Sequence, residues 1–315
     1  MALAVLALVA ALLLGAPENA AALGRGLRQE CKKNGDRCSL YAEGDCCSGM
    51  MCTMPLECSS RGSRSECFPE CRKQTLSKLN KVDYPSSSGK TPALEAGQRS
   101  RPAVVVMQEW WGVNEAIKAT ALHIAEQGYR VLIPDLYRGR VALQVMEAIG
   151  LASDLNWTRG IDDVVHAVTY LRKTGAKRVA IIGFCQGGAM AFCGAQFAGV
   201  NAALPFYGIP NNISGCNPLR IPANVPIQAH FGTNDNSFPV SRIQPLALSM
   251  QQAGVNIKLN LYEGLPHAFF NALTPEGRRL LAGNNPNYKQ PNETLVTQSF
   301  SRMTNFLRLH IRDNK

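Results

Sequence analysis

Long apolar runs, histidines and clusters of like charge are all scarce in this 315-residue sequence. No apolar run reaches the length of about 18 residues that a membrane-spanning helix requires, which excludes a multi-pass membrane protein. Lys and Arg exceed Asp and Glu by 33 to 23, but basic residues cluster only in pairs such as Arg278-Arg279. The positive charge is therefore spread over the surface, and we expect no nucleic-acid partner.

Hydrophobic residues make up 46% of the chain, which is enough to build a full core. This share excludes a wholly disordered or collagen-like protein. The length predicts two domains, or one large domain with a smaller appendage.

The N-terminal 23 residues are the most apolar part of the chain, with Ala, Leu and Val between Leu3 and Leu14 and small residues after them. This pattern predicts a cleaved signal peptide at residues 1–23 and a secreted protein. Because no Lys or Arg precedes the apolar run, an uncleaved anchor or the leader of an organelle such as the plastid stays open as an alternative.

A dense group of cysteines follows between residues 31 and 71. Its members are Cys31, Cys38, Cys46, Cys47, Cys52, Cys58, Cys67 and Cys71. The segment has few large apolar residues, so a disulfide framework is the expected substitute for a core. Zinc is the alternative, but the segment has no His and no Cys-x2-Cys pair. The spacing resembles that of knottins, and the module at residues 24–71 could bind a carbohydrate, a protein or a surface.

The segment at residues 72–101 is polar and broken by Pro, Ser and Gly, which indicates a linker and the entry strands of the next domain. Beyond it, β-branched runs alternate with amphipathic stretches of helical length. We expect strands at residues 103–107, 130–133, 179–182, 202–206, 227–231 and 257–262. We expect helices at residues 115–127, 143–153, 161–173, 187–198, 243–253 and 295–311. This alternation predicts an α/β fold with a mostly parallel central sheet flanked by helices, at whose carboxyl edge the chemistry should lie.

A Gly-x-Cys-x-Gly motif follows the third of these strands and places Cys185 between a strand and a helix. Such a sharp turn needs small neighbours, and it lifts its central side chain to the helix N-terminus, where a thiolate is stabilised. Glycine-rich turns after strands also bind phosphate, so this motif alone does not decide its role.

Two further strand ends carry the partners that a nucleophile requires. Asp235 follows the strand expected at residues 227–231, and His267 follows the one at residues 257–262. The order of nucleophile, acid and base is that of the α/β-hydrolase fold. In that fold two backbone N–H groups bind the oxyanion. Here one would come from the loop after the first strand and the other from Gln186, the residue after the nucleophile. The four other histidines fall within predicted helices and a strand and are interpreted as packing or surface residues.

The chain from about residue 82 to residue 311 resembles the dienelactone hydrolase family, the carboxymethylenebutenolidases. The motifs that carry the resemblance stand at residues 106–112, 134–139 and 183–188 and around Asp235 and His267. The resemblance implies a Cys185–His267–Asp235 triad. It also implies that Glu109 hydrogen-bonds the resting thiol and helps to deprotonate it when substrate arrives. The resemblance further implies that the backbone N–H groups of Trp110 and Gln186 make the oxyanion hole.

One departure from the family concerns the substrate. Its characterised members hold the substrate carboxylate with arginines, one of them four residues beyond the catalytic His, and this chain has Asn271 there. A neutral ester, lactone or thioester is therefore at least as good a candidate as an anionic butenolide. The expected pocket is aromatic, with Trp110, Trp111, Phe238 and Phe269.

The sequence thus predicts a cysteine hydrolase that works through an acyl-enzyme and needs no metal or organic cofactor. Its partner would be a small-molecule ester, lactone or thioester. A secreted binding or inhibitory protein, with the disulfide module as its working part and an inactive hydrolase body, stays open as an alternative. Outside the cysteine-rich segment Cys185, Cys193 and Cys216 remain, and a Cys193–Cys216 bridge would leave Cys185 free.

Overall fold

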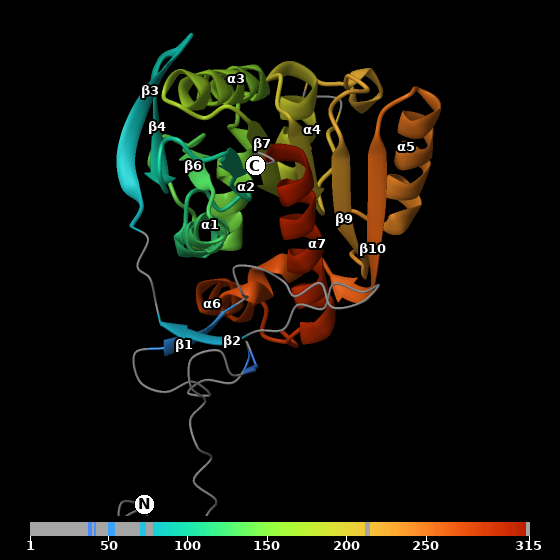
Figure 1. Cartoon of the computed structure of the whole chain (residues 1–315). Coiled ribbons are helices and arrows are strands. Elements are labelled where there is room, and N and C mark those ends of the chain that lie inside the picture. The colour runs from blue at the N-terminus through green and yellow to red at the C-terminus, as the bar shows by residue number, and fades with distance from the viewer. Residues whose placement is uncertain are drawn as a thin grey trace, which may run out of the picture.

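The computed structural model describes residues 37–39, 41, 50–53, 70–73, 78–211 and 215–312. Its main feature is an eight-stranded sheet in the order β10-β9-β8-β7-β5-β6-β4-β3, which Figure 1 shows behind helix α7. The strands of this sheet are β3 (Asn80–Ser86), β4 (Gly89–Ala96), β5 (Ala103–Met107), β6 (Arg130–Pro134), β7 (Val179–Phe184), β8 (Ala202–Phe206), β9 (Ile227–Asn234) and β10 (Ile257–Pro266).

The sheet is parallel from β6 to β10, and the antiparallel pairs are β3 with β4 and β4 with β6. Strands β5, β6, β7 and β8 are buried at every residue, which explains why they are continuous apolar runs in the sequence. The predicted fold class, a mostly parallel sheet flanked by helices, is confirmed.

Helices cover both faces of the sheet. They are α1 (Glu115–Glu126), α2 (Val145–Ser153), α3 (Trp157–Lys173), α4 (Gln186–Phe197), α5 (Val240–Gln252), α6 (Pro275–Asn284) and α7 (Glu293–Ile311), with the short 3-10 helices η2 (Pro218–Arg220) and η3 (Phe269–Leu273). Helix α3 packs on α4, whereas α1 and α7 both contact η3. No helix in the described part of the chain is both long and apolar enough to cross a bilayer.

Asparagine side chains decide where several of these helices begin. Asn114, Asn156 and Asn292 each accept a hydrogen bond from the backbone N–H three residues later, at the starts of α1, α3 and α7. This cap satisfies one of the free N–H groups that every helix start exposes. Because of these caps, α3 and α7 begin a few residues earlier than the apolar periodicity predicts.

Two parts of the chain differ from the expected element pattern. Residues 85–89, which we interpreted as part of a linker, form the turn of the β3–β4 hairpin at the edge of the sheet. The exposed face of β3 is polar, so the strand carries little apolar signal. Helix α6 was not predicted, because Pro275 and Gly277 at its start and the charged residues after them obscure its periodicity.

The cysteine-rich segment is described in part. Strands β1 (Met50–Thr53) and β2 (Glu70–Lys73) pair antiparallel, with Cys52 opposite Cys71, and a disulfide joins Cys38 to Cys52. The other five cysteines of the expected framework, Cys31, Cys46, Cys47, Cys58 and Cys67, lie outside the described residues, as does the expected signal peptide at residues 1–23.

A second disulfide joins Cys193 of α4 to Cys216, with an S–S distance of 2.10 Å. Cys193 is fully buried, so this bridge fastens α4 to the connection that leads into β9. Cys185 is the free cysteine among the described residues.

Candidate active site

The Gly-x-Cys-x-Gly turn lies between β7 and α4, as the sequence predicts. Cys185 has φ 54° and ψ −118°, a strained conformation for a residue with a side chain. A Cβ atom at Gly183 would lie 1.8 Å from the carbonyl oxygen of Gly187, and one at Gly187 would lie 2.5 Å from that of Met107. The turn therefore tolerates only glycine at these places, and it lifts the half-buried Cys185 to the N-terminus of α4.

Asp235 and His267 lie side by side because they follow the neighbouring parallel strands β9 and β10. His267 Nδ1 is 2.8 Å from Asp235 Oδ2. The second oxygen of Asp235 accepts hydrogen bonds from the backbone N–H groups of Ser237 and Phe238, at 2.8 and 2.9 Å. The carboxylate is 2% exposed and fixed by three donors, so it holds the imidazole ring in one orientation.

The protonation of His267 links this pair to Cys185. Burial by itself lowers the pKa of His267, but its hydrogen bonds to Asp235 and Cys185, together with the charges of those groups, raise this pKa to about 10. At neutral pH the ring is then an imidazolium that faces a carboxylate on one side and the sulfur on the other. An imidazolium beside a cysteine is an arrangement that generates a reactive thiolate.

Glu109 is a buried carboxyl on the loop after β5. Both of its oxygens accept hydrogen bonds from Asn271 Nδ2 at 3.1 Å, and Tyr207 donates to one of them at 3.4 Å. Burial raises the pKa of Glu109, while the bond from Asn271, the charge of His267 and the bond from Tyr207 lower it in part. The carboxyl is thus held by neutral donors, and its nearest cation is the imidazolium of His267.

The two expected oxyanion donors lie on the loop after β5 and at the first residue of α4. Within the described part of the chain, the N–H groups of Trp110 and Gln186 donate to no protein acceptor, so both remain available for a ligand. The side chain of Gln186 accepts a hydrogen bond from the buried Tyr137 hydroxyl at 3.0 Å. This bond fixes the start of α4.

The expected aromatic residues take different places. Phe238 stacks on the His267 ring with a centroid distance of 5.7 Å, and Trp110 meets Trp111 edge-on at 5.3 Å. Trp110 is half-buried, whereas Trp111 is nearly covered. Phe269 is fully buried behind Tyr207, so it supports the site from the core instead of lining an open pocket.

Apolar side chains continue from the tryptophans onto the surface. Trp111 packs against Ala142 and against Ala148 of α2, and Ala148 is the buried residue of that helix. The outer side of this segment exposes large apolar side chains, namely Val141, Leu143, Val145, Met146 and Ile149. Trp111 thus packs in an apolar cluster.

Tyr207 and Tyr137 were missed by the sequence analysis. Tyr207 follows β8, has φ 36° and places its ring 5.1 Å from that of His267. A polar aromatic residue directly after a buried strand, in the run Pro205-Phe206-Tyr207-Gly208, was the signal that could have found it.

The other histidines lie in packing positions, as predicted. His230 is fully buried between Tyr262 and Gln228, and burial lowers its pKa well below the usual value. Burial also lowers the pKa of His123 to about 4. The described residues contain no cluster of three or more His, Cys, Asp or Glu side chains arranged to hold a metal ion.

Comparison with known proteins decides the family. The sequence model of the dienelactone hydrolase family matches residues 91–311. The chain belongs to the dienelactone hydrolase family. Family membership makes it a hydrolase of carboxylic esters or lactones, which confirms the class of reaction that the sequence predicts.

Two relatives illustrate the range of names in the family. The chain is 32% identical over 182 residues to the "Putative carboxymethylenebutenolidase" of Aquifex aeolicus, covering 54% of this chain and 77% of that protein. It is 31% identical over 181 residues to a Bradyrhizobium protein named "Probable 2-oxo-3-(5-oxofuran-2-ylidene)propanoate lactonase", covering 53% and 73%.

A solved structure shares the fold. The structure titled "Putative Dienelactone Hydrolase" from Klebsiella pneumoniae has a TM-score of 0.63 and 22% identity to this chain, covering 74% of this chain and 99% of that one. The match leaves about a quarter of the chain outside the shared fold.

Proposed function

We propose that the chain hydrolyses a neutral carboxylic ester, lactone or thioester through an acyl-enzyme on Cys185. The observation that carries this proposal is the His267 ring, which lies 2.8 Å from Asp235 and whose pKa is raised by both Asp235 and Cys185. Each of the three groups follows a different strand of the sheet, and together they have the roles of nucleophile, base and orienting acid.

In the acylation step the Cys185 thiolate attacks the carbonyl carbon, and the carbonyl oxygen becomes an oxyanion near the N–H groups of Trp110 and Gln186. The imidazolium of His267 gives its proton to the leaving oxygen or sulfur as the tetrahedral intermediate collapses. Deacylation reverses these roles. His267 takes a proton from water, the hydroxide attacks the thioester carbon, and the acid leaves as the sulfur recovers its charge.

Glu109 acts before the attack in this proposal. Where Cys185 rests as a thiol, Glu109 as a carboxylate close to the site would accept the thiol proton when the substrate binds, and it would return that proton to the sulfur after deacylation. Glu109 is buried and is hydrogen-bonded by neutral donors, so its environment has a low dielectric constant. The approach of a ligand therefore strongly affects the proton transfer to Glu109.

The residue at position 271 supports a neutral substrate. Asn271 occupies the position at which an arginine would bind a carboxylate, and its amide is engaged by Glu109. The apolar side chains around Trp110 and Trp111 provide contact area for a hydrocarbon group of the substrate.

We test the proposal by hydrolysis of p-nitrophenyl acetate with the full chain beside Cys185→Ala and Cys185→Ser, while intact-mass spectra detect an acyl adduct. We expect the wild type to show turnover and an acyl adduct, and Cys185→Ala to show neither. His166→Gln is the control, since His166 lies on α3 and bonds only its own helix. Turnover that survives Cys185→Ala unchanged would refute the cysteine mechanism.

We also propose that the protein works in an oxidising compartment, as a secreted protein does. The disulfides Cys38–Cys52 and Cys193–Cys216 support this, because cytosolic thiols stay reduced. Asn156 and Asn292 stand exposed in Asn-x-Thr sequons, so a shift in mass on expression through the secretory pathway, reversed by a glycosidase, would test it. Fully reduced native protein would argue for a cytosolic or plastid location.

A further inference from the structure

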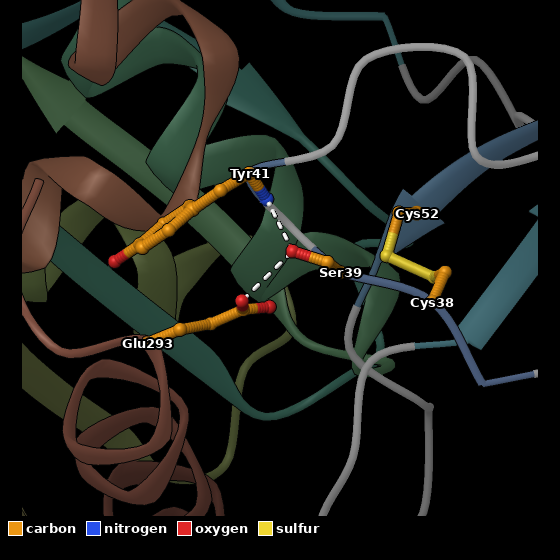
Figure 2. The surroundings of a disulfide bond; sticks show 5 residues. All are labelled: Cys38, Ser39, Tyr41, Cys52 and Glu293. Carbon is orange, nitrogen blue, oxygen red and sulfur yellow. Dashed lines mark hydrogen bonds between the residues drawn. A yellow bond between two sulfur atoms is a disulfide. The ribbon is translucent and has the colours of Figure 1, made fainter.

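Among the described residues of the cysteine-rich segment, Tyr41 and Ser39 contact the hydrolase body. Figure 2 shows Tyr41 beside Ser39 and the Cys38–Cys52 disulfide. The Tyr41 N–H donates to Ser39 Oγ at 3.1 Å, and Ser39 Oγ donates to Glu293 Oε2 at 2.8 Å. Glu293 is the first residue of α7, so these bonds join the segment to the start of the last helix.

The Tyr41 ring is partly buried against the core and lies over an arginine of α6. The guanidinium carbon of Arg278 is 5.5 Å from the centroid of the ring, a cation–π contact. Burial raises the pKa of the Tyr41 hydroxyl, which keeps it neutral, and this hydroxyl has no hydrogen-bond partner among the described residues. The ring and not the hydroxyl therefore makes the contact.

Arg278 also contacts η3, the 3-10 helix that contains Asn271. Its Nη1 donates to the carbonyl oxygen of Ala272 at 2.9 Å, in the 3-10 helix η3. Helix α6 also presses on the neighbouring residue, since a Cβ at Gly277 would lie 2.0 Å from the carbonyl oxygen of Asn271. Asn271, in turn, holds both oxygens of Glu109.

We propose that the cysteine-rich segment stabilises the active site. Tyr41 positions Arg278 and thereby maintains the hydrogen bonds from the Asn271 amide to Glu109. Tyr41 and Arg278 are positioning residues. The Cys38–Cys52 bridge contributes by limiting the freedom of Cys38, of Ser39 and of β1. This inference rests on the proposed function for its catalytic consequence, but its structural part stands without it.

Substitution of Tyr41 separates the ring from the hydroxyl. Tyr41→Ala removes the cation–π contact, so Arg278 turns to solvent and η3 loosens, whereas Tyr41→Phe keeps the ring. Arg278→Ala should act like Tyr41→Ala. Arg279→Ala is its matched control, because Arg279 is the next residue of the same helix but is exposed and pairs only with Glu276.

Hydrogen exchange measured by mass spectrometry tests the positioning without any activity. The peptide that covers η3 should lose protection in Tyr41→Ala and Arg278→Ala, while strands β5 and β7 keep theirs, and Tyr41→Phe and Arg279→Ala should match the wild type. Unchanged protection of η3 in Tyr41→Ala would overturn the inference, whatever the enzyme hydrolyses. A loss of protection throughout the sheet would also overturn it, because it would mean general destabilisation.

Kinetics then test the catalytic consequence. With p-nitrophenyl acetate, kcat of Tyr41→Ala and Arg278→Ala should fall about three- to tenfold with little change in KM, as expected for coupling through packed neighbours. The acid limb of the pH–rate profile should also move to higher pH, because Asn271 would leave Glu109 with only Tyr207 and His267 facing it. If the η3 peptide lost protection from hydrogen exchange but the pH–rate profile did not change, the link to Glu109 would be refuted. If Cys185→Ala hydrolysed p-nitrophenyl acetate as fast as the wild type, the proposed function would instead be refuted.

Discussion

The side-chain amide of Asn271 donates to both carboxylate oxygens of Glu109, with Nδ2 3.1 Å from each. The two residues are 162 positions apart in the sequence, on the loop after β5 and in η3, and both are buried. A neutral amide thus occupies the place where the family resemblance expects an arginine. The chemistry of the site depends on this pair, because the amide stabilises the carboxylate without adding a positive charge.

Replacing Asn271 by leucine should raise the pKa of Glu109. The hydrogen bonds from Asn271 lower this pKa, so their removal shifts it upward. If ionised Glu109 is needed for attack, the acid limb of kcat/KM moves to higher pH by the same amount. The pH–rate profile of p-nitrophenyl acetate hydrolysis measures it, and an unmoved acid limb would show that Glu109 does not titrate in the reaction.

Replacing Asn271 by arginine should act in the opposite direction. A cation beside Glu109 lowers the pKa of the carboxyl and moves the acid limb to lower pH. It also offers a charged donor to a substrate carboxylate, so the preference for an ester that carries a carboxylate over its neutral analogue should rise by about tenfold. Competition between a hemisuccinate ester and an acetate ester measures this ratio. An unchanged ratio would mean that residue 271 does not face the substrate.

The imidazole of His267 should stay protonated well above neutral pH. Its interactions with Asp235 and Cys185 raise the pKa to about 10, so Asp235→Asn and Cys185→Ala should each lower this pKa toward its ordinary value. Nitrogen chemical shifts of the labelled imidazole rings follow the titration, with the half-buried His166 as the internal reference. A wild-type pKa near 6.5 would contradict the hydrogen bond to the sulfur.

Removing the carboxylate of Glu95 should strongly destabilise the fold while leaving the chemistry intact. Glu95 in β4 pairs with the fully buried Arg130 of β6 and accepts a hydrogen bond from Tyr170. Glu95→Ala leaves an uncompensated buried charge, which costs about 3–5 kcal/mol in the free energy of unfolding. Denaturant unfolding measures it.

The exposed pair of Glu115 with Lys118 provides the control, since Glu115→Ala should change the free energy of unfolding by less than about 1 kcal/mol. Equal losses for both variants would show that burial of Arg130 is not what makes the pair matter.

Much of the architecture can be predicted from short stretches of the sequence. The strands β5, β7 and β8 are short apolar runs between turns, and their ends could be predicted to within two residues. The Gly-x-Cys-x-Gly turn is equally local, because the clash at Gly183 depends only on residues four positions apart. Candidate positions for nucleophile, acid and base followed, since the carboxyl ends of parallel strands meet at one edge of a sheet.

The surroundings of those candidates are not local. Tyr207 reaches Glu109 across 98 positions, and no periodicity or spacing reports such a contact. Phe269 looked like a pocket residue because it stands two positions after His267, yet the turn through Ala268, at φ 59°, directs it into the core.

The sequence by itself determined most of the strands and helices of the sheet, the family and the residue types at the strand ends, because these depend on short-range sterics and on apolar periodicity. Only the tertiary structure decided that Asn271 engages Glu109 and that Tyr41 lies over Arg278. Contacts of this kind join segments whose separation along the chain carries no signal, and they form only when the sheet and its helices fix both partners in space.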